Sequence, residues 1–262
     1  MSNNRVSKNN RVSKNKLRGI AKGPLTPSPS PCNKRQLKQY ILSVGSKTRR
    51  TCAQCGMSYL VNSPSDVKLH DKFHRICVDG RDWNMRLGEP LESISQNEAI
   101  YKVDSSRQYE CIGALEMLNI VNKELNAPDD NDFWTSGDSN GSVYVYVRNK
   151  VAVGIVSVER FNTSPGHGKK GYWFSVEDGR VVSPQPLDIL CGISRIYVCR
   201  RYRRHGIAIK LLHAVQRHLI YGLVIPSLKI AWSQPSTSGG QLAMRFNGRM
   251  HKSGKVLIPV YT

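Results

Sequence analysis

The stretch RRYRRHGIAIKLLHAVQRHLIYG, residues 200–222, decides the fold of this chain. Four arginines and a histidine precede a glycine, and an amphipathic helix follows from about residue 206 to residue 220. Apolar residues recur every four positions along it: Ile207, Leu211, Val215 and Leu219. A helix start already carries partial positive charge and unpaired N–H groups, so added cations are unfavourable there unless an anion binds. The stretch therefore predicts an anion-binding loop.

The expected anion is a phosphate group. Gly206 lets the backbone approach a ligand closely and Ala208 keeps the first turn small, so the N–H groups of 203–208 can converge on a phosphate, with Arg203 and Arg204 supplying charge. The spacing R-x-x-G-x-A fits the acyl-CoA pyrophosphate loop of the GCN5-related N-acetyltransferases. A basic, solvated turn is the alternative interpretation.

The surrounding segments predict an α/β (α+β) domain with a mixed central sheet flanked by helices. The predicted strands are 142–147, 151–159, 187–198, 228–233 and the final KVLIPVY. A helix is predicted over 108–126 and another at QLAMRF. The helix at 108–126 is expected to face the sheet with four apolar residues: Ile112, Leu115, Leu118 and Val121. The arginine loop follows a strand directly, and ligands bind at the carboxyl ends of strands in open α/β sheets.

Most of the net charge of +20 lies near the N-terminus, because residues 1–50 contain 13 Lys or Arg and no Asp or Glu. The segment includes the repeat NNRVSKN and the run PLTPSPSP, which cannot bury enough apolar area to offset chain entropy. We therefore expect residues 1–48 to be a disordered basic tail. It suits an import signal or loose contact with nucleic acid, and a solvated tail without a partner is the alternative.

The sequence contains no run of 18 apolar residues, and its first 30 residues lack the apolar core of a secretory signal. We therefore expect an intracellular protein without a membrane partner. Seven cysteines, an odd number, then indicate reduced thiols and metal ligation rather than a disulfide framework.

A zinc site is predicted by the spacing C-x2-C-x14-H-x3-H, which is formed by Cys52, Cys55, His70 and His74. Two histidines one helical turn apart share a face, and the CxxC knuckle adds two thiolates to complete a tetrahedral set. Cys77 lies just beyond and does not fit this geometry. No row of arginines occupies the groove-reading positions, so a structural or protein-docking finger is favoured over sequence-specific DNA reading.

Several motifs together resemble the establishment-of-cohesion N-acetyltransferases. They are CxxCGMSY, PSD, HDKFH, CGISRIYV, RRYRRHGIA, IYG and AWSQPSTSGGQLAMRFNG, and they cover about 49–83 and 142–262. The resemblance implies a GCN5-related N-acetyltransferase fold over 84–262 behind a zinc finger over 49–83. It also implies transfer of acetyl from acetyl-CoA to lysines on the ATPase head of the SMC subunit of cohesin during S phase, in the nucleus and on chromatin.

The resemblance also implies which residues form the site. Backbone groups of Ile196, Tyr197 and Val198 would hold the pantetheine arm. The pyrophosphate would lie on Arg203, Arg204, His205, Gly206, Ile207 and Ala208. Ser194 matches a serine near the reacting centre, whereas Gln234 stands where animal members carry the aspartate of SDP.

The missing carboxylate matters because a free lysine at pH 7 is only about 0.04% neutral, a deficit of roughly 4.6 kcal/mol. We expect Ser194 and Gln234 to order a water or the incoming amine; His205 and His213 are alternative bases, and Asp188 lies at the wrong end of its strand. Cys191 and Cys199 suggest a covalent acyl-cysteine route, which is disfavoured because cysteines in strands are usually buried apolar residues.

Two further expectations concern function beyond the catalytic domain. A chromatin-binding module with an inactive acetyltransferase fold is the alternative function, motivated by the basic tail and the missing carboxylate. Family members carry a replication-clamp motif before the finger, and RQLKQYILSV at 35–44 offers Gln36 or Gln39 with Tyr40. Without an aromatic pair at the usual spacing, a short element preceding the finger is the other interpretation of that segment.

Overall fold

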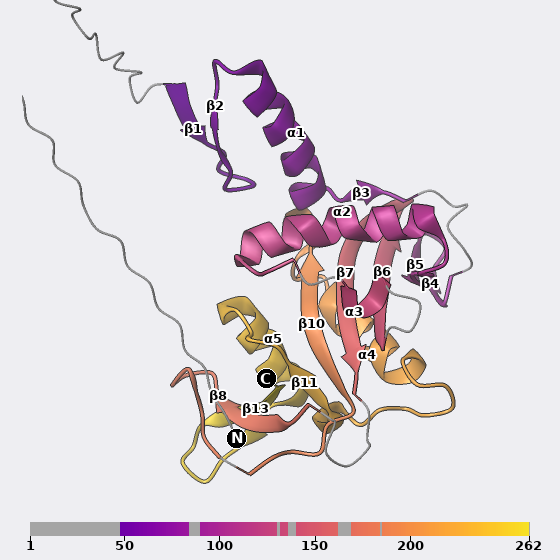
Figure 1. Cartoon of the computed structure of the whole chain (residues 1–262), viewed down its shortest axis with the longest axis vertical. Coiled ribbons are helices and arrows are strands. Elements are labelled where there is room, and N and C mark those ends of the chain that lie inside the picture. The colour runs from indigo at the N-terminus through magenta and orange to yellow at the C-terminus, as the bar shows by residue number, and fades with distance from the viewer. Residues whose placement is uncertain are drawn as a thin grey trace, which may run out of the picture. The chain divides into compact units, whose positions relative to one another are not determined.

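The computed structural model describes residues 48–83, 90–129, 132–135, 140–161, 169–183 and 185–261 (Figure 1). Residues 44–262 form one compact unit. The predicted tail, apart from Thr48, and the segment at 35–44 lie outside the described residues. Within the described residues, no helix is both long and apolar enough to cross a bilayer.

The unit is built on a mixed sheet with the strand order β4-β5-β6-β7-β10-β11-β13-β8-β9. Outside this order, β3 pairs with β7 and β12 pairs with β13. The strands on one half are β3 (Arg81–Asp82), β4 (Glu92–Ser95), β5 (Glu98–Lys102), β6 (Gly141–Arg148), β7 (Val151–Arg160) and β10 (Cys191–Val198). Those on the other half are β8 (Gly171–Ser175), β9 (Arg180–Val181), β11 (Ile230–Trp232), β12 (Arg249–Met250) and β13 (Val256–Tyr261). Neighbours pair antiparallel except at β10–β11 and β11–β13.

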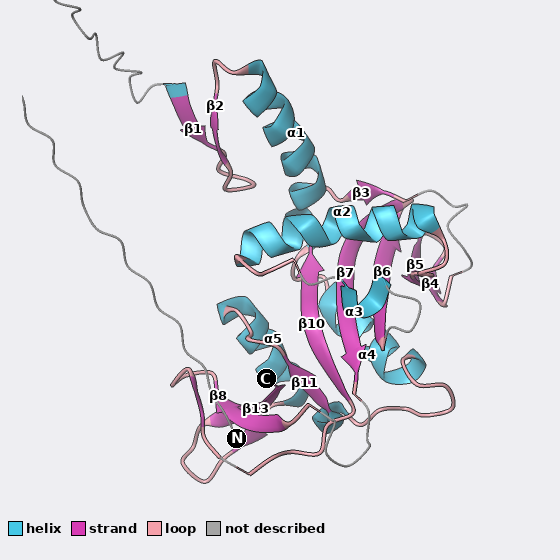
Figure 2. Cartoon of the chain, viewed as in Figure 1, coloured by secondary structure: helices cyan, strands magenta, loops and turns pink. Residues whose placement is uncertain are grey.

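Helices cover both faces of this sheet (Figure 2). They are α2 (Gln108–Leu125), α3 (Asp132–Thr135), α4 (Ile207–His218) and α5 (Thr237–Asn247), with short 3-10 turns η2 (Arg200–Tyr202) and η3 (Ser227–Lys229). The core beneath α2 and the core beneath α4 are separate clusters, so the two helices lie on opposite faces. Ser236 caps α5 by accepting a hydrogen bond from the N–H of Gly239.

The predicted helix at 108–126 is confirmed, but part of its predicted buried face is wrong. Ile112 is 44% exposed, while Gly113 and Ala114 lie against the core. A Cβ on Gly113 would come within 3.0 Å of the Trp83 ring, so the helix packs most closely through its small residues. The predicted apolar face of α4 is confirmed, because Ile207, Leu211, Val215 and Leu219 are all buried. The hairpin β6–β7 and the strands β10, β11 and β13 are also confirmed, within shorter bounds for β10 and β11.

The finger consists of β1 (Arg49–Thr51), β2 (Ser58–Leu60) and α1 (Pro64–Val78), and its helix shares a core with the sheet domain. Ile76, Cys77 and Val78 are buried at the end of α1 in the same cluster as residues of α2. The Tyr197 hydroxyl on β10 donates to the Cys77 carbonyl oxygen at 3.1 Å. The finger is therefore packed on the sheet domain rather than tethered to it.

A break in the sheet positions the functional site. Strands β10 and β11 pair in parallel only from Cys191 to Ile193, and the last bond between them runs from the Ser233 N–H to the Ile193 carbonyl oxygen at 3.0 Å. On the other side of β10, the register with β7 shifts between Ile193 and Arg195, so Ser194 is an extra residue in a β-bulge. Beyond the bulge β10 and β11 separate, which leaves one edge of β10 without a strand partner among the described residues.

Candidate active site and zinc centre

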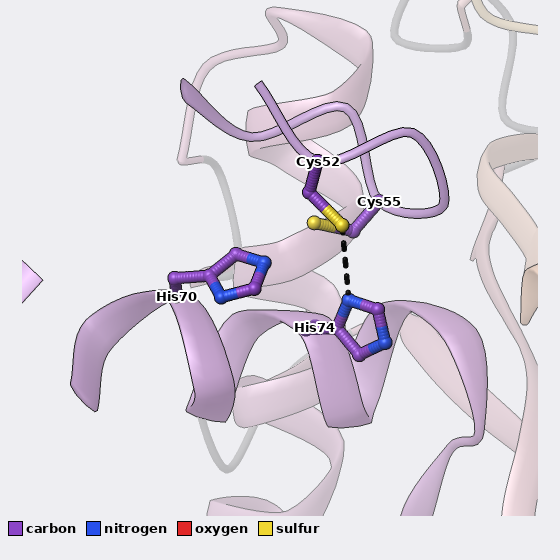
Figure 3. Close-up of side chains that lie close together, drawn as sticks. All are labelled: Cys52, Cys55, His70 and His74. Carbon is purple, nitrogen blue, oxygen red and sulfur yellow. Dashed lines mark hydrogen bonds between the residues drawn. The ribbon is translucent and has the colours of Figure 1, made fainter. Parts of the chain in front are cut away.

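The four predicted metal ligands lie together at the finger. The ligand atoms of Cys52, Cys55, His70 and His74 are all within 4.8 Å of one another (Figure 3). Ser63 caps α1 and Pro64 starts it, so the helix begins where it brings the two histidines toward the knuckle.

The donor set fits zinc in both chemistry and environment. Two thiols and two imidazoles are typical zinc ligands. The His70 Nε2 atom is buried and has no hydrogen-bond partner among the described residues, which a metal bond would satisfy. Hydrogen bonds, chiefly from the backbone of Cys55, lower the pKa of the Cys52 thiol to about 5 and favour the thiolate that zinc requires. Cys77 is not in the cluster, because its thiol donates to Glu124 at 3.0 Å instead.

The open edge of β10 carries the residues predicted to hold the pantetheine arm. Ile196 and Val198 pack on the core beneath α4, whereas the Tyr197 side chain is buried on the α2 face. The Tyr197 side chain is therefore structural, and only its backbone faces the gap beyond the β10–β11 pairing. Exposed N–H and C=O groups of a strand edge pair readily with an extended, amide-containing ligand.

The loop before α4 has the backbone expected of a phosphate site. Gly206 is the N-cap residue of α4 with φ 77°, a left-handed conformation that favours glycine. Apart from its neighbours in the chain, no atom of the described residues lies within 4 Å of where its Cβ would be, so a ligand can approach the backbone there. The first N–H groups of α4, including those of Ile207 and Ala208, have no carbonyl partner within the helix. His205 and Arg204 are exposed beside them.

The arginines of this loop differ in their contacts, which the sequence did not reveal. Arg203 donates from Nε to the Val198 carbonyl oxygen at 3.0 Å and from Nη2 to Glu124 at 3.1 Å. Arg200 pairs with the same carboxylate, and Arg201 pairs with Asp79 at the end of α1. Three of the four arginines are therefore tied to protein carboxylates, and only Arg204 has none among the described residues. Its φ of 69° shows that the loop turns sharply there.

A cavity of about 380 Å³ adjoins the bulge and is lined by both predicted catalytic residues, Ser194 and Gln234. Three segments form it: the end of α2 through Pro128, residues 193–196 of β10, and residues 232–239 after β11. Gln234 has φ 23°, an uncommon backbone conformation for a residue other than glycine. The structure thus brings Ser194 and Gln234 to one cavity, at the point where the two strands separate.

The alternative chemistries weighed from the sequence lack support in this geometry. Burial raises the pKa of the thiols of Cys191 and Cys199 to about 12, so neither is a thiolate nucleophile at neutral pH. Asp188 pairs with Lys229 before β10 begins, away from the bulge. His213 is exposed on α4 and contacts Gln216 and the Phe246 ring.

Two polar residues that the sequence analysis missed organise the site. Glu124 at the end of α2 binds loop arginines, and Arg195 on β10 is 9% exposed with its guanidinium turned toward the end of α2. The only available signal was the position of Arg195 directly after Ser194, in a strand that otherwise reads as apolar. Partners more than 60 residues away give no pattern in a single sequence.

Both the sheet domain and the finger match known protein families. A profile described as "ESCO1/2 acetyl-transferase" matches residues 187–257, and one described as "zinc-finger of acetyl-transferase ESCO" matches residues 39–76. The second match begins inside the segment expected to be a disordered tail.

Similar proteins cover most of the chain. N-acetyltransferase ECO1 of Saccharomyces cerevisiae is 38% identical over 257 residues, which covers 83% of this chain and 91% of the relative. N-acetyltransferase ECO1 of Kluyveromyces lactis is 32% identical over 269 residues, covering 88% and 98% respectively. Among solved structures, the xEco2 acetyltransferase domain bound to a K105–CoA conjugate is 26% identical with a TM-score of 0.51, and the match covers 65% of this chain and 96% of that one.

The zinc-ligand cluster, the separated strands and the glycine at the start of α4 agree with these matches along the chain. The expected fold, cofactor and structural zinc are thereby confirmed. The chain belongs to the cohesion-establishment family of ECO1 and ESCO proteins, and is an acetyl-CoA-dependent N-acetyltransferase with a structural zinc finger.

Proposed function

We propose that this enzyme acetylates lysine side chains on the ATPase head of the SMC subunit of cohesin, in the nucleus during S phase, and so establishes sister-chromatid cohesion. The observation that carries the proposal is the cavity at the β10 bulge, which adjoins the open strand edge and is lined by Ser194 and Gln234. A lysine side chain entering there meets the end of an acetyl-CoA arm that follows the edge. A related domain, the xEco2 acetyltransferase domain, has been solved bound to a K105–CoA conjugate.

The residues of the site have distinct proposed roles. The backbone groups of Ile196, Tyr197 and Val198 bind the pantetheine arm, and the loop 203–208 binds the pyrophosphate. Ser194 and Gln234 line the place where the amine attacks the thioester carbonyl carbon. The C–S bond then breaks and CoA leaves with a proton, while the amine loses one to water.

The amine must first become neutral. Deprotonation of a lysine side chain at pH 7 costs roughly 4.6 kcal/mol, and desolvation in the cavity reduces that cost because it disfavours the charged form. Gln234 does not titrate, so it serves this step as a hydrogen-bonding group for the amine or for an ordered water that accepts the proton.

The test is transfer of radiolabelled acetyl from acetyl-CoA to purified cohesin heads, with acceptor lysines mapped by mass spectrometry. Histone tails and a small amine are parallel acceptors, and the Gly206→Asp variant is the negative control. We expect label on the head subunit with the wild-type enzyme only. Label on histone tails or the amine with none on the heads would contradict the cohesin assignment. Binding of CoA without turnover of any acceptor would favour an inactive chromatin-binding module.

The proposed location and partners outside the catalytic domain rest on residues 1–44. The basic tail is proposed to contact nucleic acid loosely, and the segment at 35–44 to bind the replication clamp. A pull-down with the clamp compares the full chain with a Gln36→Ala, Gln39→Ala double variant. Equal recovery of both proteins would remove the clamp proposal.

A further inference from the structure

Strand β10 holds a buried guanidinium group against the hydroxyl of Ser194. Arg195 follows Ser194 in the bulge and is only 9% exposed. Its Nη1 atom donates to the Ser194 Oγ at 3.2 Å and to the Ser194 carbonyl oxygen at 2.9 Å. The same group reaches the end of α2 and the segment after it, where Nε donates to Asn122 Oδ1 at 2.9 Å and Nη2 to the carbonyl oxygen of Pro128, a cavity-lining residue, at 3.1 Å.

These contacts determine what the Ser194 hydroxyl can do. A guanidinium group only donates hydrogen bonds, so the Ser194 oxygen must accept from Arg195. The hydroxyl hydrogen then has to point elsewhere, and no described protein atom accepts it. Because Ser194 lines the cavity, that hydrogen is available to a group bound there.

We propose that Arg195 is a positioning residue that fixes Ser194 as a hydrogen-bond donor toward the reacting thioester. The inference rests on the proposed placement of Ser194 at the reacting centre, and it goes further by assigning the direction of the hydrogen bond and the residue that sets it. Ser194 then does not accept the amine proton. It stabilises the negative charge that develops on the thioester as the amine attacks.

The bulge is the reason why this arrangement exists. In a regular strand, neighbouring side chains point to opposite faces. The extra residue lets Ser194 remain at the cavity while Arg195 reaches Asn122 and Pro128, so one guanidinium holds the strand and the end of α2 at a fixed separation. A donor held in advance by such contacts needs no reorganisation when charge develops, and loss of one comparable donor costs about 10²–10³ in kcat.

The test is a double-mutant cycle of Ser194→Ala and Arg195→Lys, read by single-turnover self-acetylation with acetyl-CoA. This assay needs no cohesin substrate, so failure of the cohesin assignment would leave it intact. We expect Ser194→Ala to lower the rate about 10²-fold and Ser194→Thr to retain most of the rate. Lysine lacks the planar fork, so Arg195→Lys should lower the rate about tenfold in the wild type and less than twofold in the Ser194→Ala background.

Two measurements separate positioning from loss of folding. The Kd of acetyl-CoA by calorimetry should stay within about twofold in every soluble variant. Asn122→Leu removes the acceptor of Arg195 Nε and provides a second route to the same effect if Arg195→Lys does not fold. The control is Arg81→Lys, which alters an arginine bound to Glu116 away from the cavity. Equal loss of rate from Arg195→Lys with and without Ser194, or full loss in Ser194→Thr, would overturn the proposal.

Discussion

Glu124 and Arg200 form an ion pair in which Nη2 lies 2.6 Å from Oε1, and the same guanidinium donates from Nη1 to the Gln54 carbonyl oxygen at 2.7 Å. Gln54 lies between the two zinc-binding cysteines. The other oxygen of Glu124 accepts a hydrogen bond from Arg203 in the loop before α4. A single carboxylate at the end of α2 therefore connects the zinc knuckle with the loop that starts α4. Three of the four arginines before Gly206 therefore hold this loop in place, and the backbone N–H groups that follow remain the predicted anion site.

Glu124→Gln should weaken acetyl-CoA binding and destabilise the fold. The change keeps the shape but leaves Arg200 and Arg203 without a carboxylate, at a cost of about 1–3 kcal/mol of unfolding free energy. Calorimetry should report a severalfold higher Kd for acetyl-CoA. The matched control is Glu116→Gln on the same helix, which loses its pair with Arg81 but does not touch the loop. A raised Kd in both variants would show a general effect of destabilisation.

The same carboxylate should give the protein a pH-dependent stability. Burial alone would raise the pKa of Glu124, but the hydrogen bonds from Cys77 and Arg200 and the charge of the two arginines outweigh burial and lower it. Because the folded pKa lies below the unfolded value of about 4.3, the contribution is present above that pH and is lost as the pH falls through the folded pKa. The difference in unfolding free energy between wild type and Glu124→Gln should thus be constant near neutrality and shrink below about pH 4. A difference that grows on acidification would contradict this assignment.

One zinc ion per chain should bind the wild-type protein, and Cys55→Ala should lose it. The finger is too small to fold on its own hydrophobic core, so loss of the metal should unfold it before any direct effect on catalysis. Metal analysis by mass spectrometry measures the stoichiometry. Cys77→Ala is the control and should keep the zinc, since Cys77 contacts Glu124 and lies outside the ligand cluster. A full zinc in Cys55→Ala would refute the ligand set.

Gly206→Asp should abolish acetyl-CoA binding. A carboxylate at this position would face the pyrophosphate, and the φ of 77° is unfavourable for any side chain. Gly254→Asp is the matched control, because Gly254 has φ 79° and equally open space but lies in the turn before β13. Calorimetry should detect loss of affinity at Gly206 only. Unchanged affinity in Gly206→Asp would place the pyrophosphate elsewhere.

The sequence predicted the features whose information is local. Four ligands at fixed spacing predicted the zinc cluster, and the four-residue period of α4 predicted its buried face. The short strands β4, β5, β8 and β9 were not predicted, because each is only two to five residues long and is stabilised by its neighbours in the sheet. Ile112 was assigned to the wrong face, because close packing through Gly113 cannot be inferred from periodicity alone.

The contacts of charged residues were the larger gap. Arg203 was expected to screen the pyrophosphate, and the structure places its guanidinium against Glu124, 79 residues earlier in the chain. The burial of Arg195 could not be predicted, because charged residues are seldom buried and its partners, Asn122 and Pro128, lie in and just after α2. Sequence spacing predicted which backbone segments form the site. The contacts of each charged side chain could not be predicted, because they depend on tertiary packing.

The last prediction concerns the proton of the acceptor lysine. If Ser194 and Gln234 act as hydrogen-bonding groups, replacing either with alanine should lower kcat and leave the pH at which activity rises nearly unchanged, because neither side chain titrates between pH 6 and 9. Gln234→Asp should raise kcat and move the rise to lower pH, since a carboxylate favours proton acceptance, and aspartate tolerates the positive φ at this position better than glutamine. Single-turnover rates across pH measure this without interference from product release. An ionisation that disappears in Ser194→Ala or Gln234→Ala would instead indicate a titrating base coupled to that residue, and His205 would be the next residue to replace.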